Sequence, residues 1–230
     1  MTPSPLIELT DVNVRFERRT ILENVNLTLS RGDFLAITGP NGGGKTTLLR
    51  VMLKLLKPTS GTVAYYDAEG HPVKKLNVGY LPQKNSIDSR FPMTVTEVIA
   101  TGLLPIKGLS PERKRELVGQ TIERLDLVSR ANAPIGEISG GQLQRALLGR
   151  AIITSPELLV LDEPLSYLDR HFVGETYRIL ESLREEMTIV LVSHEMTTIA
   201  EMANRHILVD REVHACHAHS HHFAPPPCDV

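Results

Sequence analysis

The chain has 230 residues, 41% of them apolar, and a formal net charge of −2 at pH 7. These values predict a soluble globule built on one large domain, or on a core domain with an insertion. Lys and Arg are spread along the chain, so no nucleic-acid partner is predicted. No apolar run reaches the roughly 18 residues of a spanning helix, and the polar start does not resemble a secretory signal, so we expect a cytosolic chain.

The first elements in chain order are strands. Residues 7–16 and 20–30 alternate between apolar and polar side chains, and the apolar stretch 33–38 predicts a buried strand that ends in a glycine-rich turn. Residues 45–58 have apolar side chains at helical spacing, and Pro58 stops that pattern. Further strands are predicted at 62–66, 78–81, 158–161, 188–192 and 206–209. Helical patterns lie before and between the last three, which indicates an α/β fold with a mainly parallel sheet.

Between about residues 83 and 155 the pattern changes to successive helices. The stretches 94–102, 110–128 and 141–153 all have helical spacing. We interpret this region as a helical subdomain inserted into a domain that covers residues 1–213. Residues 214–230 are expected to be an appended, disordered tail rich in His, Cys and Pro.

The turn "GPNGGGKT" fits the phosphate-loop pattern G-x-x-x-x-G-K-[ST] and lies between a predicted strand and a predicted helix. Glycines allow backbone amides to surround a phosphate, and a helix N-terminus favours negative charge. Lys45 would reach the β- and γ-phosphates, and the Thr46 hydroxyl would bind Mg²⁺. The residues expected to contact the nucleotide here are Gly39, Pro40, Asn41, Gly42, Gly43, Gly44, Lys45, Thr46 and Thr47.

Two adjacent carboxylates end the apolar strand "ELLVLDEP". Apolar strands seldom end this way unless the charges face a cation or a reacting water. Asp162 is therefore predicted to hold Mg²⁺, directly or through water. Glu163 is predicted to orient and polarise the attacking water as a general base. Together with the phosphate loop, the pair predicts a nucleoside triphosphatase.

A second anion site is predicted at "ISGGQLQR", where a helix begins. Ser139 is a good N-cap, and Gly140 and Gly141 leave backbone amides accessible. The stretch resembles the signature sequence of ABC transporters, usually Leu-Ser-Gly-Gly-Gln. Ser139, Gly140, Gly141 and Gln142 are therefore further candidates for nucleotide contact.

From residue 6 to about 212 the motifs follow the order found in ABC transporter ATP-binding subunits. The resemblance implies a P-loop nucleotide-binding domain with an antiparallel β subdomain and an inserted helical subdomain. By the same resemblance Gln83 is the Q-loop glutamine, which senses Mg²⁺ and the attacking water, and His194 is the switch histidine that contacts the γ-phosphate. Asp169 belongs to the D-loop, and Phe16 would stack on adenine.

The resemblance also implies partners. The phosphate loop of one subunit faces the signature of the other, so two ATP molecules close a head-to-tail homodimer. Residues 83–104 would receive an integral membrane permease at the cytoplasmic face of the membrane, and an extracytoplasmic substrate-binding protein would act indirectly. Three positions depart from the family's usual residues, Phe16, Ile138 and Tyr167; the tyrosine could alter how the two D-loops pass each other.

The cargo is suggested by residues 80–102, which resemble the matching stretch of zinc and manganese importer ATPases. Two alternatives stay open. One is an importer of haem or siderophores. The other is an ABC ATPase that does mechanical work or has no transport role.

The chain ends in "HACHAHSHH", which is rich in ligands for transition metals. It follows the last predicted strand, so it is not expected to be the catalytic centre. It predicts a zinc site that reports metal sufficiency to the ATPase, or else a solvated tail with incidental affinity. The candidate ligands are His214, Cys216, His217, His219, His221 and His222.

Overall fold

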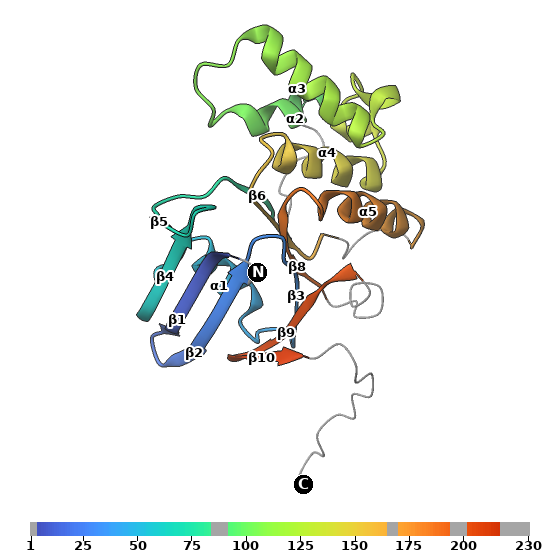
Figure 1. Ribbon diagram of the computed structural model, residues 1–230. Helices are drawn as coiled ribbons and strands as arrows, with labels where there is room; N and C mark the ends of the chain where they lie inside the picture. The colour runs from blue at the N-terminus through green and yellow to red at the C-terminus, as the bar shows by residue number, and fades with distance from the viewer. Residues whose placement is uncertain (1–3, 84–91, 165–169, 194–201, 217–230) are drawn as a thin grey trace.

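The computed structural model describes residues 4–83, 92–164, 170–193 and 202–216. These segments form a four-stranded sheet, a six-stranded sheet and a layer of helices (Figure 1). The four-stranded sheet and α1 lie on one side of the six-stranded sheet, and the remaining helices lie on the other (Figure 1). The predicted α/β class is confirmed.

The four-stranded sheet is antiparallel, with strand order β2-β1-β4-β5. Its strands are β1 (Pro5–Phe16), β2 (Arg19–Ser30), β4 (Ser60–Tyr66) and β5 (Pro72–Val73). The alternating pattern of residues 7–16 and 20–30 produces the β1–β2 pair, in which Leu9 lies opposite Leu27. Register shifts along this pair let two 12-residue strands bend over the core.

The six-stranded sheet has strand order β10-β9-β3-β8-β7-β6. Its strands are β3 (Phe34–Thr38), β6 (Val78–Leu81), β7 (Leu158–Asp162), β8 (Thr188–Val192), β9 (Arg205–Asp210) and β10 (Glu212–Cys216). All neighbours are parallel except β9 and β10. The three central strands β3, β7 and β8 are buried at every position, which explains their continuous apolar sequences.

Two hydrophobic cores share this sheet, because successive side chains of a strand point to opposite faces. Leu158 and Val160 of β7 pack toward the four-stranded sheet and α1, whereas Leu159 and Leu161 pack toward the helical layer. Strand β7 is therefore packed on both faces up to its last residue. This packing holds Asp162 and Glu163 in place at the carboxyl end of the sheet.

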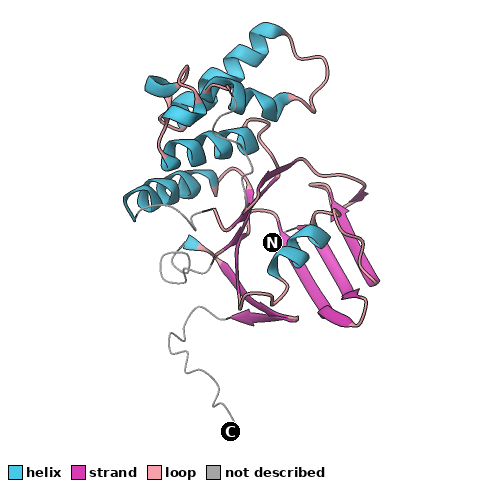
Figure 2. Cartoon of the chain, turned by 180° about the vertical axis from the view of Figure 1, so that it is seen from behind, coloured by secondary structure: helices cyan, strands magenta, loops and turns pink. Residues whose placement is uncertain are grey.

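The helices are α1 (Lys45–Met52), α2 (Val95–Ala100), α3 (Pro111–Arg124), α4 (Gly140–Ile152) and α5 (Arg170–Leu183), with short 3₁₀ helices at Thr101–Leu103, Val128–Arg130 and Ile135–Glu137. The helices α2, α3 and α4 pack together, α4 also contacts strand β6, and α5 lies beside α4 (Figures 1 and 2). Thr94 and Ser110 cap α2 and α3 with their hydroxyl groups. None of the helices within the described ranges is long and apolar enough to cross a membrane.

Helix α1 is shorter than the sequence predicts. It ends at Met52, six residues before Pro58, because Lys54 adopts a left-handed backbone with φ 53° and its amide donates to the Val51 carbonyl. The Lys54 ammonium then lies 3.7 Å from the centre of the Tyr65 ring.

The end of the described chain also differs from expectation. Residues 214–216, which we expected to belong to the disordered tail, are part of strand β10, which pairs antiparallel with β9. Val213 packs against the core beneath the four-stranded sheet, and this apolar position anchors the strand. His214 and Cys216 are therefore sheet residues, whereas the other predicted tail ligands, from His217 on, lie outside the described residues.

Candidate active site

The predicted phosphate loop lies where the sequence places it, between the buried strand β3 and helix α1. Gly44 is the N-cap of α1 and has a left-handed φ of 105°, so the helix begins at Lys45. The first backbone N–H groups of a helix have no partner inside the helix. The turn thus combines free amides with the positive end of a helix dipole, which is the arrangement that binds phosphate.

Gly39 and Gly43 have no room for a side chain, because strand β9 passes close to the phosphate loop. A Cβ at Gly39 would lie 2.1 Å from the Val209 carbonyl oxygen, and one at Gly43 would lie 2.6 Å from the same atom. Gly39 also has φ 139°. A side chain at either position would push the loop away from the sheet.

Replacing Gly39 with alanine is therefore expected to destabilise the protein by at least about 3 kcal/mol, since both the backbone angle and the space disfavour a side chain. Gly70 is the matched control, because its φ is 85° and a Cβ there would have no atom within 4 Å. Gly70→Ala should cost about 1 kcal/mol, from the left-handed backbone alone. Chemical denaturation measures both; equal losses would contradict the close approach of β9.

Lys45 is the buried cation of the loop, with only 6% of its surface exposed. Its ammonium group donates to the carbonyl oxygens of Gly39 and Pro40, each at 2.9 Å. Burial lowers the pKa of Lys45, while the nearby charges of Glu163 and Asp162 act to raise it. These interactions place the ammonium at the phosphate loop, within the field of both carboxylates.

Asp162 ends β7 and is 2% exposed. Burial and the charge of Glu163 raise its pKa, although the Thr46 hydroxyl donates a hydrogen bond to the carboxylate. Its Oδ1 atom is buried and accepts no hydrogen bond from any residue of the described ranges. A buried carboxylate oxygen beside a threonine hydroxyl is a donor set suited to a hard cation, so Thr46 and Asp162 fit Mg²⁺.

Glu163 follows Asp162 in a left-handed conformation, with φ 51°. Its backbone N–H donates to the Val192 carbonyl at 3.0 Å, and its carboxylate accepts a hydrogen bond of 2.5 Å from the Gln83 amide. Gln83, which lies 80 positions earlier, thus meets the predicted general base.

The predicted second anion site is the capped start of α4. The Ser139 hydroxyl accepts from the Gln142 backbone N–H at 3.2 Å, and the Gln142 side chain accepts from the Ser139 backbone N–H at 3.0 Å. This capping box confirms Ser139 as the N-cap. Ser139 and Gly140 are at least partly exposed, whereas Gly141, which we expected to be accessible, is buried. The open part of the turn is therefore at Ser139 and Gly140.

For the other predicted site residues the structure gives less detail. Phe16 lies at the end of β1 and is 52% exposed, which leaves about half of its surface open to contact. His194, Asp169 and Tyr167 lie outside the described residues. Their assigned roles, like that of Phe16, stay predictions.

Two contacts around the site have no signal in the sequence. The Arg211 backbone N–H, in the turn between β9 and β10, donates to the Gly43 carbonyl at 2.9 Å. The Gln144 amide donates to the Pro164 carbonyl at 2.6 Å. Both join segments that are far apart along the chain, and both involve backbone carbonyls, which every residue carries.

Comparisons with known proteins agree with this site. The chain is 38% identical over 211 residues to a protein of Pasteurella multocida named zinc import ATP-binding protein ZnuC, covering 91% of this chain and 74% of that protein. It is 34% identical to the zinc uptake system ATP-binding protein ZurA of Listeria innocua, over 98% of this chain and 91% of that protein.

Among solved structures, the fold matches a transporter described as of the metal-chelate type, in an inward-facing conformation, with a TM-score of 0.81, 25% identity and coverage of 94% of this chain and 84% of that one. It also matches a dimeric ATP-binding cassette bound to ADP and phosphate, with a TM-score of 0.76, 26% identity and coverage of 90% and 96%. Residues 22–166 match the family described as ABC transporter. The chain therefore belongs to the ABC transporter family.

Proposed function

We propose that this chain is the ATP-hydrolysing subunit of an importer of divalent metal ions, zinc or manganese. The observation that carries the proposal is the joint placement of Lys45, Asp162 and Glu163 at one end of the six-stranded sheet. The sequence identity that this chain shares with zinc import and zinc uptake ATP-binding proteins, over nearly its whole length, supports a metal ion as the cargo.

The phosphates of ATP would be held by the backbone amides of the loop and by Lys45. Lys45 would exchange its two carbonyl acceptors for β- and γ-phosphate oxygens, which are stronger acceptors because they are charged. Thr46 and Asp162 would hold Mg²⁺, with Gln83 beside them. The ion would neutralise charge on the phosphate oxygens when bound.

Glu163 would take a proton from the water that attacks the γ-phosphorus, while the bond between that phosphorus and the β–γ bridging oxygen breaks. The products are ADP and inorganic phosphate. Gln83 donates to the Glu163 carboxylate, so its amide can hold that group in position toward the water. His194 would contact the γ-phosphate, and Asp169 would act where two subunits meet.

The accessible Ser139 and Gly140 at the start of α4 would complete the site of a second copy of the chain. ATP then closes a head-to-tail dimer, and hydrolysis loosens it. The chain would work at the cytoplasmic face of the membrane, bound to a permease near Gln83 and α2. A substrate-binding protein outside the membrane would deliver the ion to that permease.

Uptake by cells tests the cargo. Cells that lack this chain should lose uptake of radioactive zinc or manganese, and the parent sequence should restore it, whereas the Lys45→Ala variant should not. Loss of haem or siderophore uptake instead would favour the metal-chelate alternative, which the match to a metal-chelate-type transporter raises. Normal uptake of all of these would contradict the importer proposal.

We also propose that the C-terminal segment binds Zn²⁺ and lowers ATP hydrolysis when zinc is plentiful. In the described part, Cys216 lies directly opposite His206 in the β9–β10 pair, and such pairs lie side by side on one face of a sheet. Removing residues 217–230 together with a Cys216→Ser change, and titrating zinc against ATP hydrolysis, tests this. Identical inhibition with and without the segment would contradict a sensor.

A further inference from the structure

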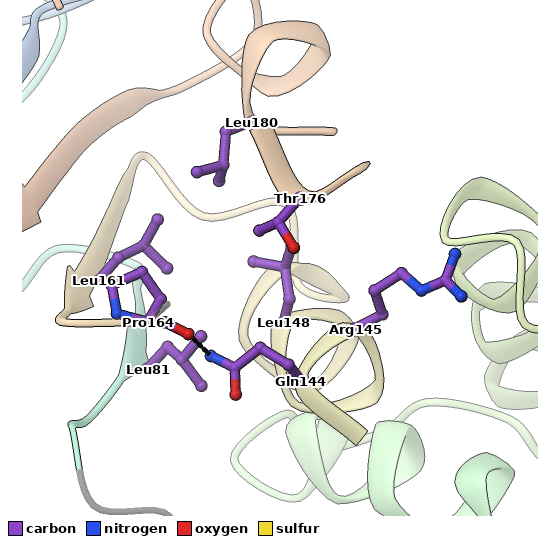
Figure 3. Close-up of a pocket in the computed structure, with 8 residues that line it drawn as sticks. All are labelled: Leu81, Gln144, Arg145, Leu148, Leu161, Pro164, Thr176 and Leu180. Atoms are coloured by element: carbon purple, nitrogen blue, oxygen red, sulfur yellow. Dashed lines mark hydrogen bonds between the residues drawn. The ribbon is translucent and has the colours of Figure 1, made fainter. Parts of the chain in front are cut away.

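Helix α4 contacts two parts of the chain that follow the predicted general base, Glu163. One is Pro164, directly after it, and the other is helix α5. The Gln144 side chain reaches the carbonyl of Pro164, one residue beyond Glu163 (Figure 3). The neighbouring Arg145 lies 3.6 Å from the Glu175 carboxylate on α5. Arg145 also lies 3.6 Å from Asp126, in the helical layer. Two consecutive residues of α4 thus join three parts of the molecule.

The turn at Glu163 needs such support. A left-handed backbone is unfavourable for a residue with a side chain, and it persists only where neighbouring contacts hold it. One contact lies at the Glu163 N–H, which donates to Val192, and another at its side chain, which accepts from Gln83. Gln144 holds the turn from its other end, through Pro164.

The surroundings strengthen the contact between Gln144 and Pro164. Leu81, Leu148, Leu161 and Leu180 line the small pocket beside it (Figure 3). Leu81 and Leu161 come from the strands β6 and β7, and Leu180 from α5. In an apolar setting a hydrogen bond is stronger than in water, and a carbonyl that loses its donor is left at a higher free energy.

We infer that Gln144 is a positioning residue for ATP hydrolysis. Its side chain fixes the turn at Glu163, and it lies on α4, the helix that begins at the signature. This rests on the proposed function, in which Ser139 and Gly140 contact the ATP of the second subunit. Gln144 is five residues from Ser139 on one continuous helix. A shift of α4 when it meets that ATP therefore moves the donor that holds this chain's own general base. Gln144 thus links the two ATP sites of the dimer.

Gln144→Met tests the inference, since methionine keeps the length of the side chain and its helix propensity but cannot donate. We expect kcat for ATP hydrolysis to fall about five- to tenfold, the effect of one lost hydrogen bond, with KM for ATP unchanged. Gln120→Met is the matched control, because Gln120 is exposed on α3 and bonds only to Glu116 among the described residues. It should keep the parent kcat. Gln144→Lys retains a donor and should recover most of the rate.

The Glu163→Gln background distinguishes positioning from a general effect on folding. If Gln144 acts through Glu163, then adding Gln144→Met to Glu163→Gln should change the residual single-turnover rate by less than about twofold. An equal fall in both backgrounds, or a Gln144→Met variant with the parent kcat, would overturn the inference. A parent protein that does not hydrolyse ATP would instead contradict the proposed function.

Discussion

Replacing Lys45 with alanine is expected to reduce ATP affinity at least about 100-fold, which corresponds to the loss of two charge-assisted hydrogen bonds in a shielded site. No other ammonium or guanidinium group in the described ranges donates to the carbonyls of the phosphate loop. The protein should still fold, because the variant removes a buried charge, and the carbonyls that lose this donor belong to Gly39 and Pro40, which are at least partly exposed and can bind water. Equilibrium titration with a fluorescent ATP analogue measures the change.

Lys54→Ala is the matched control, because Lys54 lies just beyond the same helix and carries the same charge, yet it is exposed and faces Tyr65. Its ATP affinity should stay within about twofold of the parent, which is the scale expected for an exposed charge. If Lys45→Ala bound ATP as tightly as Lys54→Ala does, the phosphate-loop assignment would be wrong.

Replacing Glu163 with glutamine is expected to lower kcat about 100- to 10,000-fold, the usual contribution of a general base. Binding should persist, because Lys45 and the loop amides are untouched. ATP would then accumulate in a closed dimer, which gel filtration with Mg²⁺ and ATP detects as an increase in apparent mass. The amide also removes the charge beside Asp162, whose pKa is raised in part by Glu163.

Glu157→Gln makes the same chemical change just before the strand that ends at Asp162. Glu157 pairs with Arg31 at 3.1 Å and accepts from the Asn77 backbone N–H, and both contacts lie at the opposite end of β7 from Asp162 and Glu163. It should hydrolyse ATP at the parent rate. A Glu163→Gln variant as active as Glu157→Gln would mean that another group activates the water.

Much of the site could be predicted because its parts are local in sequence. The phosphate loop and the pair Asp162 and Glu163 each need only a strand, a turn and a few residues, and local patterns encode such units. The N-cap at Ser139 follows from the same kind of rule. The role of Gln83 follows only from the resemblance to the ABC family, and the structure places its amide against Glu163.

Other features depend on three-dimensional packing. The contacts of Gln144 with Pro164, and of Arg211 with Gly43, are made by backbone carbonyls of distant segments, which no residue pattern marks. Strand β10 escapes prediction for a different reason. His214 and Cys216 are typical metal ligands and indicate a metal-binding tail, although Val213 and Ala215 alternate with polar residues as a strand requires.

We propose that each ATP site combines the phosphate loop of one chain with the signature of another. Lys45→Ala disables the loop. Gly140→Asp places a carboxylate at the exposed start of α4, where it repels phosphate but suits the helix N-terminus, so folding is retained. The decisive measurement is ATP hydrolysis by an equimolar mixture of the two variants. We predict that each alone is inactive and that the mixture regains activity, since mixed dimers contain one intact site; a mixture as inactive as its components would contradict the shared site.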